Sequence, residues 1–204
     1  MIQLIEACKE LKGKPILCNI THDFREGTVT LLRGHNGCGK TMLLRLLCGL
    51  IRPTSGQVTA DKEHTFGVMI ENIAFLAYEN AAYNLRYLAN IRKTIGEEEI
   101  DEWLKKVNLF DVRKKKVRTF SLGMKQRLGI CQAFMESPDV LLLDEPFNAL
   151  DSENARMVCG LIQDAVDAGK IVVVAAHGEL PEKFKFDTVI QMENGKMISS
   201  TDNR

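Results

Sequence analysis

The amino-acid sequence predicts an α/β fold with a mainly parallel β-sheet, antiparallel strands near the N-terminus and an inserted α-helical subdomain. Three observations lead to this prediction. Strand-like apolar runs alternate with helical segments in the first and last thirds of the 204-residue chain. The middle third has helical periodicity and few strand formers. The runs VLLL and IVVVAA lack polar alternation, which is typical of strands buried on both faces.

The first part of the chain alternates short runs of strand formers with polar turns. Strands are expected at residues 2–7, 16–20, 28–32, 57–60 and 65–70. Residues 41–50 (TMLLRLLCGL) are apolar on nearly every side, which predicts a buried helix. The following RPTSG breaks that helix.

The rest of the chain is first helical and then alternates between strands and helices. Helices are expected at residues 84–93, 97–107, 121–137 and 152–168. Apolar strands are expected at residues 140–143 and 171–176, and Asn194-Gly195 marks a closing hairpin. We therefore predict a core made of residues 1–71 and 136–204, and a helical subdomain of residues 72–135.

Composition narrows the class of protein. Apolar residues make up 45% and charged residues 26% of the chain, and the formal net charge is zero. A neutral chain is a poor match for a nucleic-acid-binding surface, so no nucleic-acid partner is expected. The six cysteines lack CxxC or Cys/His spacing, which favours reduced thiols in the cytoplasm over disulfides or zinc. No apolar run has the length needed to cross a bilayer, so a role at a membrane requires a partner.

The segment GHNGCGKT matches the pattern G-x-x-x-x-G-K-[ST] between an expected strand and an expected helix. Its glycines let backbone N–H groups converge on phosphate oxygens, and the helix start adds positive potential. Lys40 would reach the β- and γ-phosphates, and the Thr41 hydroxyl would hold Mg²⁺. A glycine-rich turn with an unrelated lysine is the alternative, which the strand–loop–helix context disfavours. We predict a P-loop NTPase core that binds ATP and Mg²⁺ through Gly34, His35, Asn36, Gly37, Cys38, Gly39, Lys40, Thr41 and Met42.

Two expected strands end in side chains suited to catalysis. Asp144 and Glu145 close the run VLLLDE, where Asp144 is placed to hold Mg²⁺ and Glu145 to polarise an attacking water. His177 ends the next strand in the same way and could orient that water beside the γ-phosphate. The alternatives are a solvated acidic turn and a structural histidine.

A second anion site is expected at the start of the helix that follows residue 120. Ser121 is a good N-cap, and the N–H groups of the first helical turn point at an anion. One chain offers no second phosphate for this site. The alternative is a capped amphipathic helix without a ligand.

The phosphate loop, a helical insert, FSLGMKQR, LLLDEP, NALD and a strand ending in histidine occur in an order that resembles the ATP-binding subunits of ABC transporters. The resemblance covers essentially the whole chain. It implies a head-to-tail dimer in which each signature helix binds the partner's ATP, and a D-loop crosses the same interface. The signature positions are Ser121, Leu122, Gly123 and Met124, and the D-loop positions are Asn148, Ala149, Leu150 and Asp151.

Several positions depart from the pattern of that family. The signature has Leu122 in place of glycine and Met124 in place of glutamine, and SLGMKQRLGI resembles exporters of drugs, peptide antibiotics and lipids. Glu71 stands where the family usually has the Q-loop glutamine, and its carboxylate could join the Mg²⁺ shell. Near Leu11 no aromatic residue is present to stack on adenine, so we expect weaker nucleotide binding.

The sequence therefore predicts an ATPase subunit at the cytoplasmic face of a membrane. It would dimerise on ATP, with an identical or a paralogous subunit, and drive a separate permease that exports a drug, peptide or lipid. Residues 71–87 either dock that permease or belong to the subdomain core. The basic residues 113–118 form either a solvated loop or a source of positive potential that supports phosphate binding. Two rival functions are a soluble non-transport ABC-type ATPase and a small P-loop kinase.

Overall fold

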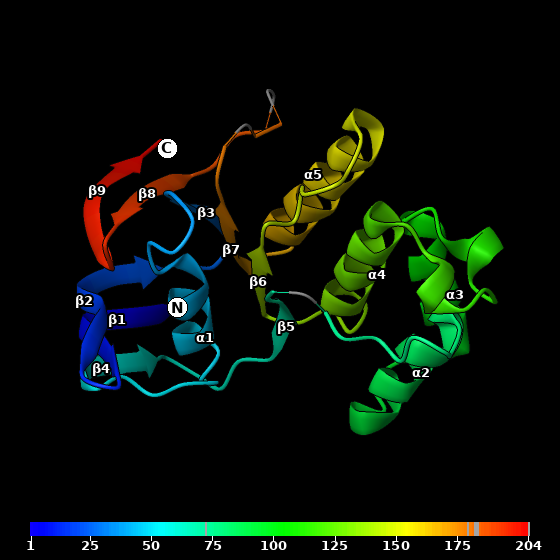
Figure 1. Cartoon of the computed structure of the whole chain (residues 1–204), viewed down its shortest axis with the longest axis horizontal. Helices are drawn as coiled ribbons and strands as arrows, with labels where there is room; N and C mark the ends of the chain where they lie inside the picture. Colours follow the sequence, from blue (N-terminus) through cyan, green and yellow to red (C-terminus); the bar gives the residue numbers. More distant parts are fainter. Residues whose placement is uncertain (72, 179, 182–183, 204) are drawn as a thin grey trace.

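The computed structural model describes the chain except residues 72, 179, 182–183 and 204. Residue 72, where the predicted helical subdomain begins, and residue 204, where the predicted core ends, thus lie outside the described residues. The central sheet has the strand order β5-β6-β7-β3-β8-β9 (Figure 1). Neighbouring strands run parallel except for the antiparallel β8–β9 hairpin. The strands are β3 (Thr28–Arg33), β5 (Phe66–Met69), β6 (Val140–Asp144), β7 (Ile171–Ala176), β8 (Thr188–Glu193) and β9 (Lys196–Asp202).

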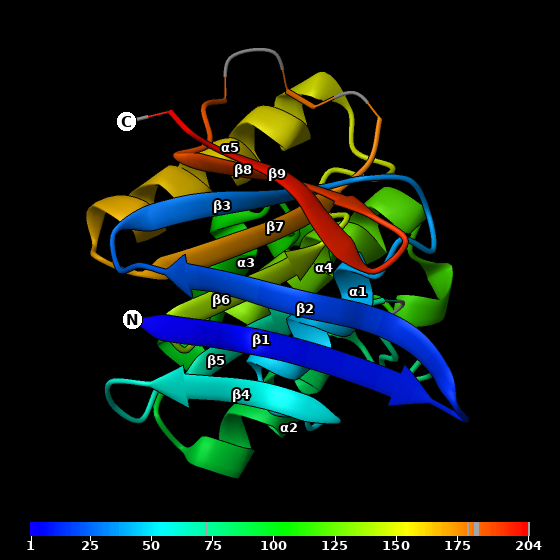
Figure 2. The ribbon, with the colours of Figure 1, turned by 90° about the vertical axis from the view of Figure 1, so that its left-hand side faces the viewer.

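A second sheet, antiparallel throughout, is built from the N-terminal part of the chain in the order β2-β1-β4. Its strands are β1 (Ile2–Leu11), β2 (Lys14–Phe24) and β4 (Ser55–Ala60). Figure 2 shows these three strands side by side, with α1 (Lys40–Leu47) behind them. The predicted fold class, a mainly parallel sheet with antiparallel N-terminal strands, is confirmed.

The central sheet is buried on both faces because each apolar strand sends successive side chains to opposite sides. On β6, Val140 and Leu142 join the hydrophobic cluster that also contains α1 and the N-terminal sheet. Leu141 and Leu143 join the cluster on the other face, which contains the remaining helices. This arrangement accounts for the absence of polar residues in VLLL and IVVVAA.

Of the remaining helices, α2, α3 and α4 form a lobe beside the strands in Figure 1, whereas α5 packs against β7 and β3. They are α2 (Ala81–Arg92), α3 (Glu97–Lys106), α4 (Leu122–Phe134) and α5 (Ser152–Asp167), with 3₁₀ turns at Phe110–Val112 and Val117–Thr119. Helix α4 crosses β5 so closely that a Cβ on Gly67 would lie 1.9 Å from the carbonyl oxygen of Ala133. The domain boundaries at residues 71 and 135 stay a prediction.

The ends of several elements differ from the sequence-based prediction. Strand β1 continues to Leu11 and strand β2 already begins at Lys14, so both are longer than predicted. Only one face of this sheet is buried, and charged residues fit the other face. Helix α1 ends at Leu47, just before Gly49 in the left-handed region at φ +72°. Helix α4 ends at Phe134 rather than near residue 137.

Candidate active site

The site is assembled at one edge of the central sheet, where four neighbouring parallel strands end. Glu71 follows β5, Asp144 ends β6 and Glu145 comes next, His177 follows β7, and residues 34–41 follow β3. Ligands of open α/β sheets bind at this carboxyl edge. The order β5-β6-β7-β3 therefore brings together predicted site residues that lie more than 100 positions apart in the chain.

The phosphate loop is shaped by glycines and filled by its own lysine. Gly37 and Gly39 adopt φ of +81° and +110°, a region that L residues with a side chain rarely occupy. The Lys40 ammonium group is buried and donates hydrogen bonds to the carbonyl oxygens of Gly34 (2.7 Å) and His35 (3.3 Å). A hollow of about 330 Å³ opens between this loop and the strand end that carries His177. A buried cation beside an open hollow is suited to a polyphosphate.

Thr41 and Asp144 form the part of the site suited to a divalent cation. The Thr41 hydroxyl donates a 2.6 Å hydrogen bond to the Asp144 carboxylate. Burial raises the pKa of Asp144, and the hydrogen bond from Thr41 partly offsets that effect. In the described part of the chain no three His, Cys, Asp or Glu side chains form a metal cluster. Two hard oxygen ligands without a full protein cage fit Mg²⁺, which takes its other ligands from water and phosphate.

Glu145 occupies the centre of the site in a constrained conformation. Its backbone has φ +52°, and its N–H donates a 2.8 Å hydrogen bond to the carbonyl oxygen of Ala175. The carboxylate lies 2.5 Å from Nδ1 of His177 and 4.0 Å from Nζ of Lys40. Because Nδ1 of His177 is engaged, Nε2 is the ring nitrogen left for another group. A carboxylate held between an imidazole and a lysine can accept a proton from water.

Glu71 forms an ion pair with a residue of helix α1. Its backbone is left-handed at φ +57°, and its carboxylate pairs with the Arg45 guanidinium at 2.7 Å. The side chains of Glu71 and Arg45 are 55% and 34% exposed, so the pair lies at the rim of the site. Arg45 was not singled out from the sequence, because an arginine in an apolar helix carries no motif.

The signature helix begins as predicted, and the D-loop packs against it. The Ser121 hydroxyl accepts a 3.2 Å hydrogen bond from the backbone N–H of Met124, and Leu122 is exposed. A Cβ on Gly123 would lie 2.7 Å from the carbonyl oxygen of Ala149, so only glycine permits this approach. Among the described residues, no hydrogen bond joins Ser121 to the phosphate loop of the same chain.

The D-loop connects the catalytic strand to α5. Ala149 is left-handed at φ +59°, and the Asp151 carboxylate caps α5 by accepting a 2.8 Å hydrogen bond from the N–H of Asn154. That bond lowers the pKa of Asp151. Asn148 is exposed beside it, and Leu150 is partly buried.

Gln126 is a second residue that sequence reasoning missed. Its side-chain amide, one turn into α4, donates a 2.7 Å hydrogen bond to the carbonyl oxygen of Glu145. The signature helix is therefore bonded to the backbone of the central carboxylate. The contact joins residues 19 positions apart, and no spacing rule would have found it.

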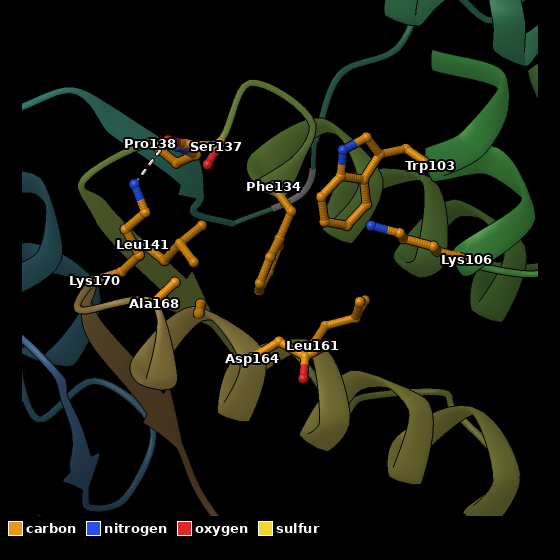
Figure 3. Close-up of a pocket in the computed structure, with 11 residues that line it drawn as sticks. Trp103, Lys106, Phe134, Ser137, Pro138, Leu141, Leu161, Asp164, Ala168 and Lys170 are labelled. Carbon is orange, nitrogen blue, oxygen red and sulfur yellow. Dashed lines mark hydrogen bonds between the residues drawn. The ribbon is translucent and has the colours of Figure 1, made fainter. Parts of the chain in front are cut away.

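A separate cavity of about 160 Å³ lies where the lobe meets the core (Figure 3). Trp103 and Lys106 from α3, Phe134 from α4 and Leu161 from α5 line it, and the Lys106 ammonium sits 4.4 Å from the centroid of the Trp103 ring. The described residues that line this cavity include none of the predicted site residues.

Comparison with known proteins gives the family. Residues 17–148 match the family model described as ABC transporter. The chain is 37% identical to the uncharacterized ABC transporter ATP-binding protein YybJ of Bacillus subtilis, over 98% of this chain and 96% of that protein. The chain belongs to the ABC transporter family. It is an ATP-binding subunit of that family and an ATPase.

Further relatives of this ABC ATPase differ in their named roles. It is 38% identical to the bacitracin transport ATP-binding protein BcrA of Bacillus licheniformis, over 97% of this chain and 68% of that protein. It is 32% identical to the spermidine/putrescine import ATP-binding protein PotA of Fusobacterium nucleatum, over 97% of this chain and 56% of PotA. The dimeric bacterial ABC transporter cassette MJ0796 shares the fold, with a TM-score of 0.89 and 24% identity over 100% of this chain and 99% of that one.

Two positions at which the sequence departs from the expected family pattern are exposed. Leu122, where the resemblance predicts a signature glycine, has its side chain exposed at the start of α4. Leu11, near which the adenine-stacking aromatic was expected, is exposed at the end of β1. No helix in the described ranges combines the length and apolar character that spanning a membrane requires.

Proposed function

We propose that this ABC ATPase dimerises on ATP and powers a separate membrane permease from the cytoplasmic face of the membrane. The observation that carries this proposal is that one chain holds a phosphate loop and a signature helix, and that no hydrogen bond between described residues joins the two. A head-to-tail two-fold dimer supplies each phosphate loop with the signature helix of the other subunit.

The proposed ATP site uses residues that the fold already holds together. The backbone of residues 34–42 would cradle the phosphates, and Lys40 would exchange its carbonyl partners for β- and γ-phosphate oxygens. Thr41 and Asp144 would hold Mg²⁺, with Glu71 at the rim of the same site. When bound, Mg²⁺ would neutralise phosphate charge.

Hydrolysis is proposed to use Glu145 and His177 as one unit. Glu145 would accept a proton from a water whose oxygen forms a bond to the γ-phosphorus, while the bond from that phosphorus to the β–γ bridging oxygen breaks. The products are ADP and inorganic phosphate. His177, held through Nδ1 by Glu145, would present Nε2 to the γ-phosphate.

The partner subunit is proposed to complete the site in trans. The first turn of α4, at residues 121–124, would bind the γ-phosphate of the partner's ATP through backbone N–H groups and the Ser121 hydroxyl. Residues 148–151 would cross the same interface. The hydrogen bond from Gln126 to the carbonyl oxygen of Glu145 would link ATP contact at one site to the base of the other.

Export is the proposed direction of transport, with a drug, peptide or lipid as substrate. The identity to BcrA and the signature SLGMKQ favour export, whereas the identity to PotA leaves import as the alternative. For the permease we propose docking on the first described residues of the predicted segment 71–87, namely residues 71 and 73–78. There Leu76 and Tyr78 are exposed, while Leu85 further along is core.

The test is the mass in solution of the Glu145→Gln variant, which should bind ATP without hydrolysing it. Light scattering should show a monomer without nucleotide and a dimer with Mg-ATP. Adding Ser121→Arg should abolish the dimer, while Ser199→Arg on exposed strand β9 should leave it intact. A protein that binds ATP but stays monomeric in every variant would refute ATP-driven self-association.

A further inference from the structure

We propose that the helical lobe carries a surface that binds the anionic face of a lipid bilayer. The surface has two parts, a basic run at residues 113–118 and an apolar stripe formed by Tyr83, Tyr87 and Ile91 on α2. The proposal rests on the proposed function, because a permease partner would hold the lobe beside a membrane.

The apolar stripe faces solvent. Its three residues recur at a spacing of four, which places them along one side of α2. Their exposed fractions are 41% for Tyr83, 56% for Tyr87 and 70% for Ile91. The opposite side of the same helix is core, where Leu85 and Ala89 are buried. Helix α2 therefore exposes apolar surface to solvent in addition to the apolar side that it buries in the hydrophobic core.

Backbone hydrogen bonds hold the basic run against the start of α2. Lys116 forms a β-bridge with Asn80, the N-cap of that helix. The N–H of Ala82 donates to the carbonyl oxygen of Arg113 at 3.1 Å, and the N–H of Val117 donates to that of Glu79 at 2.9 Å. The basic run therefore lies against the N-terminal end of α2, the end at which the stripe begins with Tyr83, although some thirty positions separate the two along the chain.

Few ion pairs hold the basic side chains of the run. Residues 113–118 contain five basic residues and no acidic one, in a chain whose net charge is zero. Arg113 pairs with Asp101. The exposed lysines 114, 115 and 116 form no ion pair with any described residue. The guanidinium of Arg118 lies 5.7 Å from the ring centroid of Tyr78. A local positive field thus borders exposed aromatic rings.

A bilayer matches both parts at once. Lysines are point charges on flexible stems, which suit mobile phosphate headgroups better than one fixed bidentate anion. Tyrosine side chains settle at the membrane–water interface, and an isoleucine gains by entering the acyl boundary. A nucleic acid would use the lysines and stack on the tyrosines but would leave Ile91 in water.

The experiment is sedimentation of the nucleotide-free chain with lipid vesicles. Vesicles of phosphatidylcholine mixed with phosphatidylglycerol should bind the wild type, and vesicles of phosphatidylcholine alone should not. Changing lysines 114, 115 and 116 to glutamine should lower the partition coefficient by about a hundredfold, since each removes one cation near the surface. Tyr83→Ser with Tyr87→Ser should weaken binding further.

The matched control removes the same charge elsewhere. Lysines 12, 14 and 185 are exposed outside the lobe, and changing them to glutamine should leave vesicle binding unchanged. An equal loss in this control, or no binding by the wild type, would overturn the proposal. Tighter binding to single-stranded oligonucleotides than to the mixed vesicles would also overturn the proposal. The same holds if the lysine 114–116 variant still binds vesicles but loses ATPase activity measured without vesicles. ATP-driven dimerisation is read separately, so its failure would count against the proposed function alone.

Discussion

Gly67 on β5 offers a direct test of how closely the signature helix packs on the sheet. A Cβ at this position would lie 1.9 Å from the carbonyl oxygen of Ala133 on α4. Carbon–oxygen contacts are normally no shorter than about 3.3 Å, so Gly67→Ala requires the helix to retreat by about 1.4 Å. Overpacking of this kind costs roughly 1–3 kcal/mol.

For a chain of this length each kcal/mol shifts the melting temperature by about 2–4 °C, so we expect a fall of roughly 2–12 °C. The matched control is Gly160→Ala on α5, where a Cβ would meet nothing within 4 Å. Alanine is better than glycine in an open helical position by about 0.5–1 kcal/mol, so the same substitution should raise the melting temperature there.

Calorimetry of both variants measures the effect on stability, and light scattering with Mg-ATP measures its effect on dimerisation. Because α4 carries Ser121, Gly67→Ala should also weaken ATP-dependent dimerisation, whereas Gly160→Ala should not. Melting temperatures that move in the same direction in both variants would refute the reasoning from the helix–sheet contact.

Three further predictions concern charge and accessibility. Burial raises the pKa of Asp144, so the protonated carboxyl contributes stability that is complete below about pH 3.9 and is lost as pH rises through the folded-state pKa. Asp144→Asn should therefore stabilise the nucleotide-free protein at pH 7 by on the order of 1 kcal/mol, with a gap that closes toward pH 4 in thermal melts; a constant gap would contradict this. Arg45→Gln leaves the Glu71 carboxylate unpaired at the rim of the site, so ATP affinity should fall by up to about fivefold in a fluorescence titration and should recover when Glu71→Gln is added. Persistent weak binding in the double variant would speak against that charge effect. Cys38 and Cys131 are buried, and burial also raises the pKa of Cys131, so mass spectrometry should find both unmodified after iodoacetamide treatment at pH 8 and alkylated in urea. Labelling of native Cys131 would show that the core opens there.

The fold class was predictable because its signals are local. Strands buried on both faces have continuous apolar sequences, and VLLL and IVVVAA became β6 and β7. The ends of β1 and β2 were less predictable. Their outer residues are charged, and pairing across the hairpin extends them beyond what composition indicates.

The candidate site divides in the same way. Residues 34–41 could be recognised because a phosphate loop is one continuous segment with a fixed spacing. Gln126 and Arg45 could not be recognised, because each acts through a partner on another element. Their contacts, to the carbonyl oxygen of Glu145 and to the Glu71 carboxylate, depend on how helices are placed over the sheet.

By itself the sequence determined the residue types that can hold a nucleotide, the order of the motifs and the family to which they belong. The tertiary structure decided which of these groups meet. Strand order set His177 between the strand of Glu145 and the strand of the phosphate loop. Packing of the lobe set the basic run against the start of α2. Sequence motifs and strand patterns depend on a few neighbouring residues. Contacts between distant elements depend instead on the free energy gained when both faces of the sheet are buried.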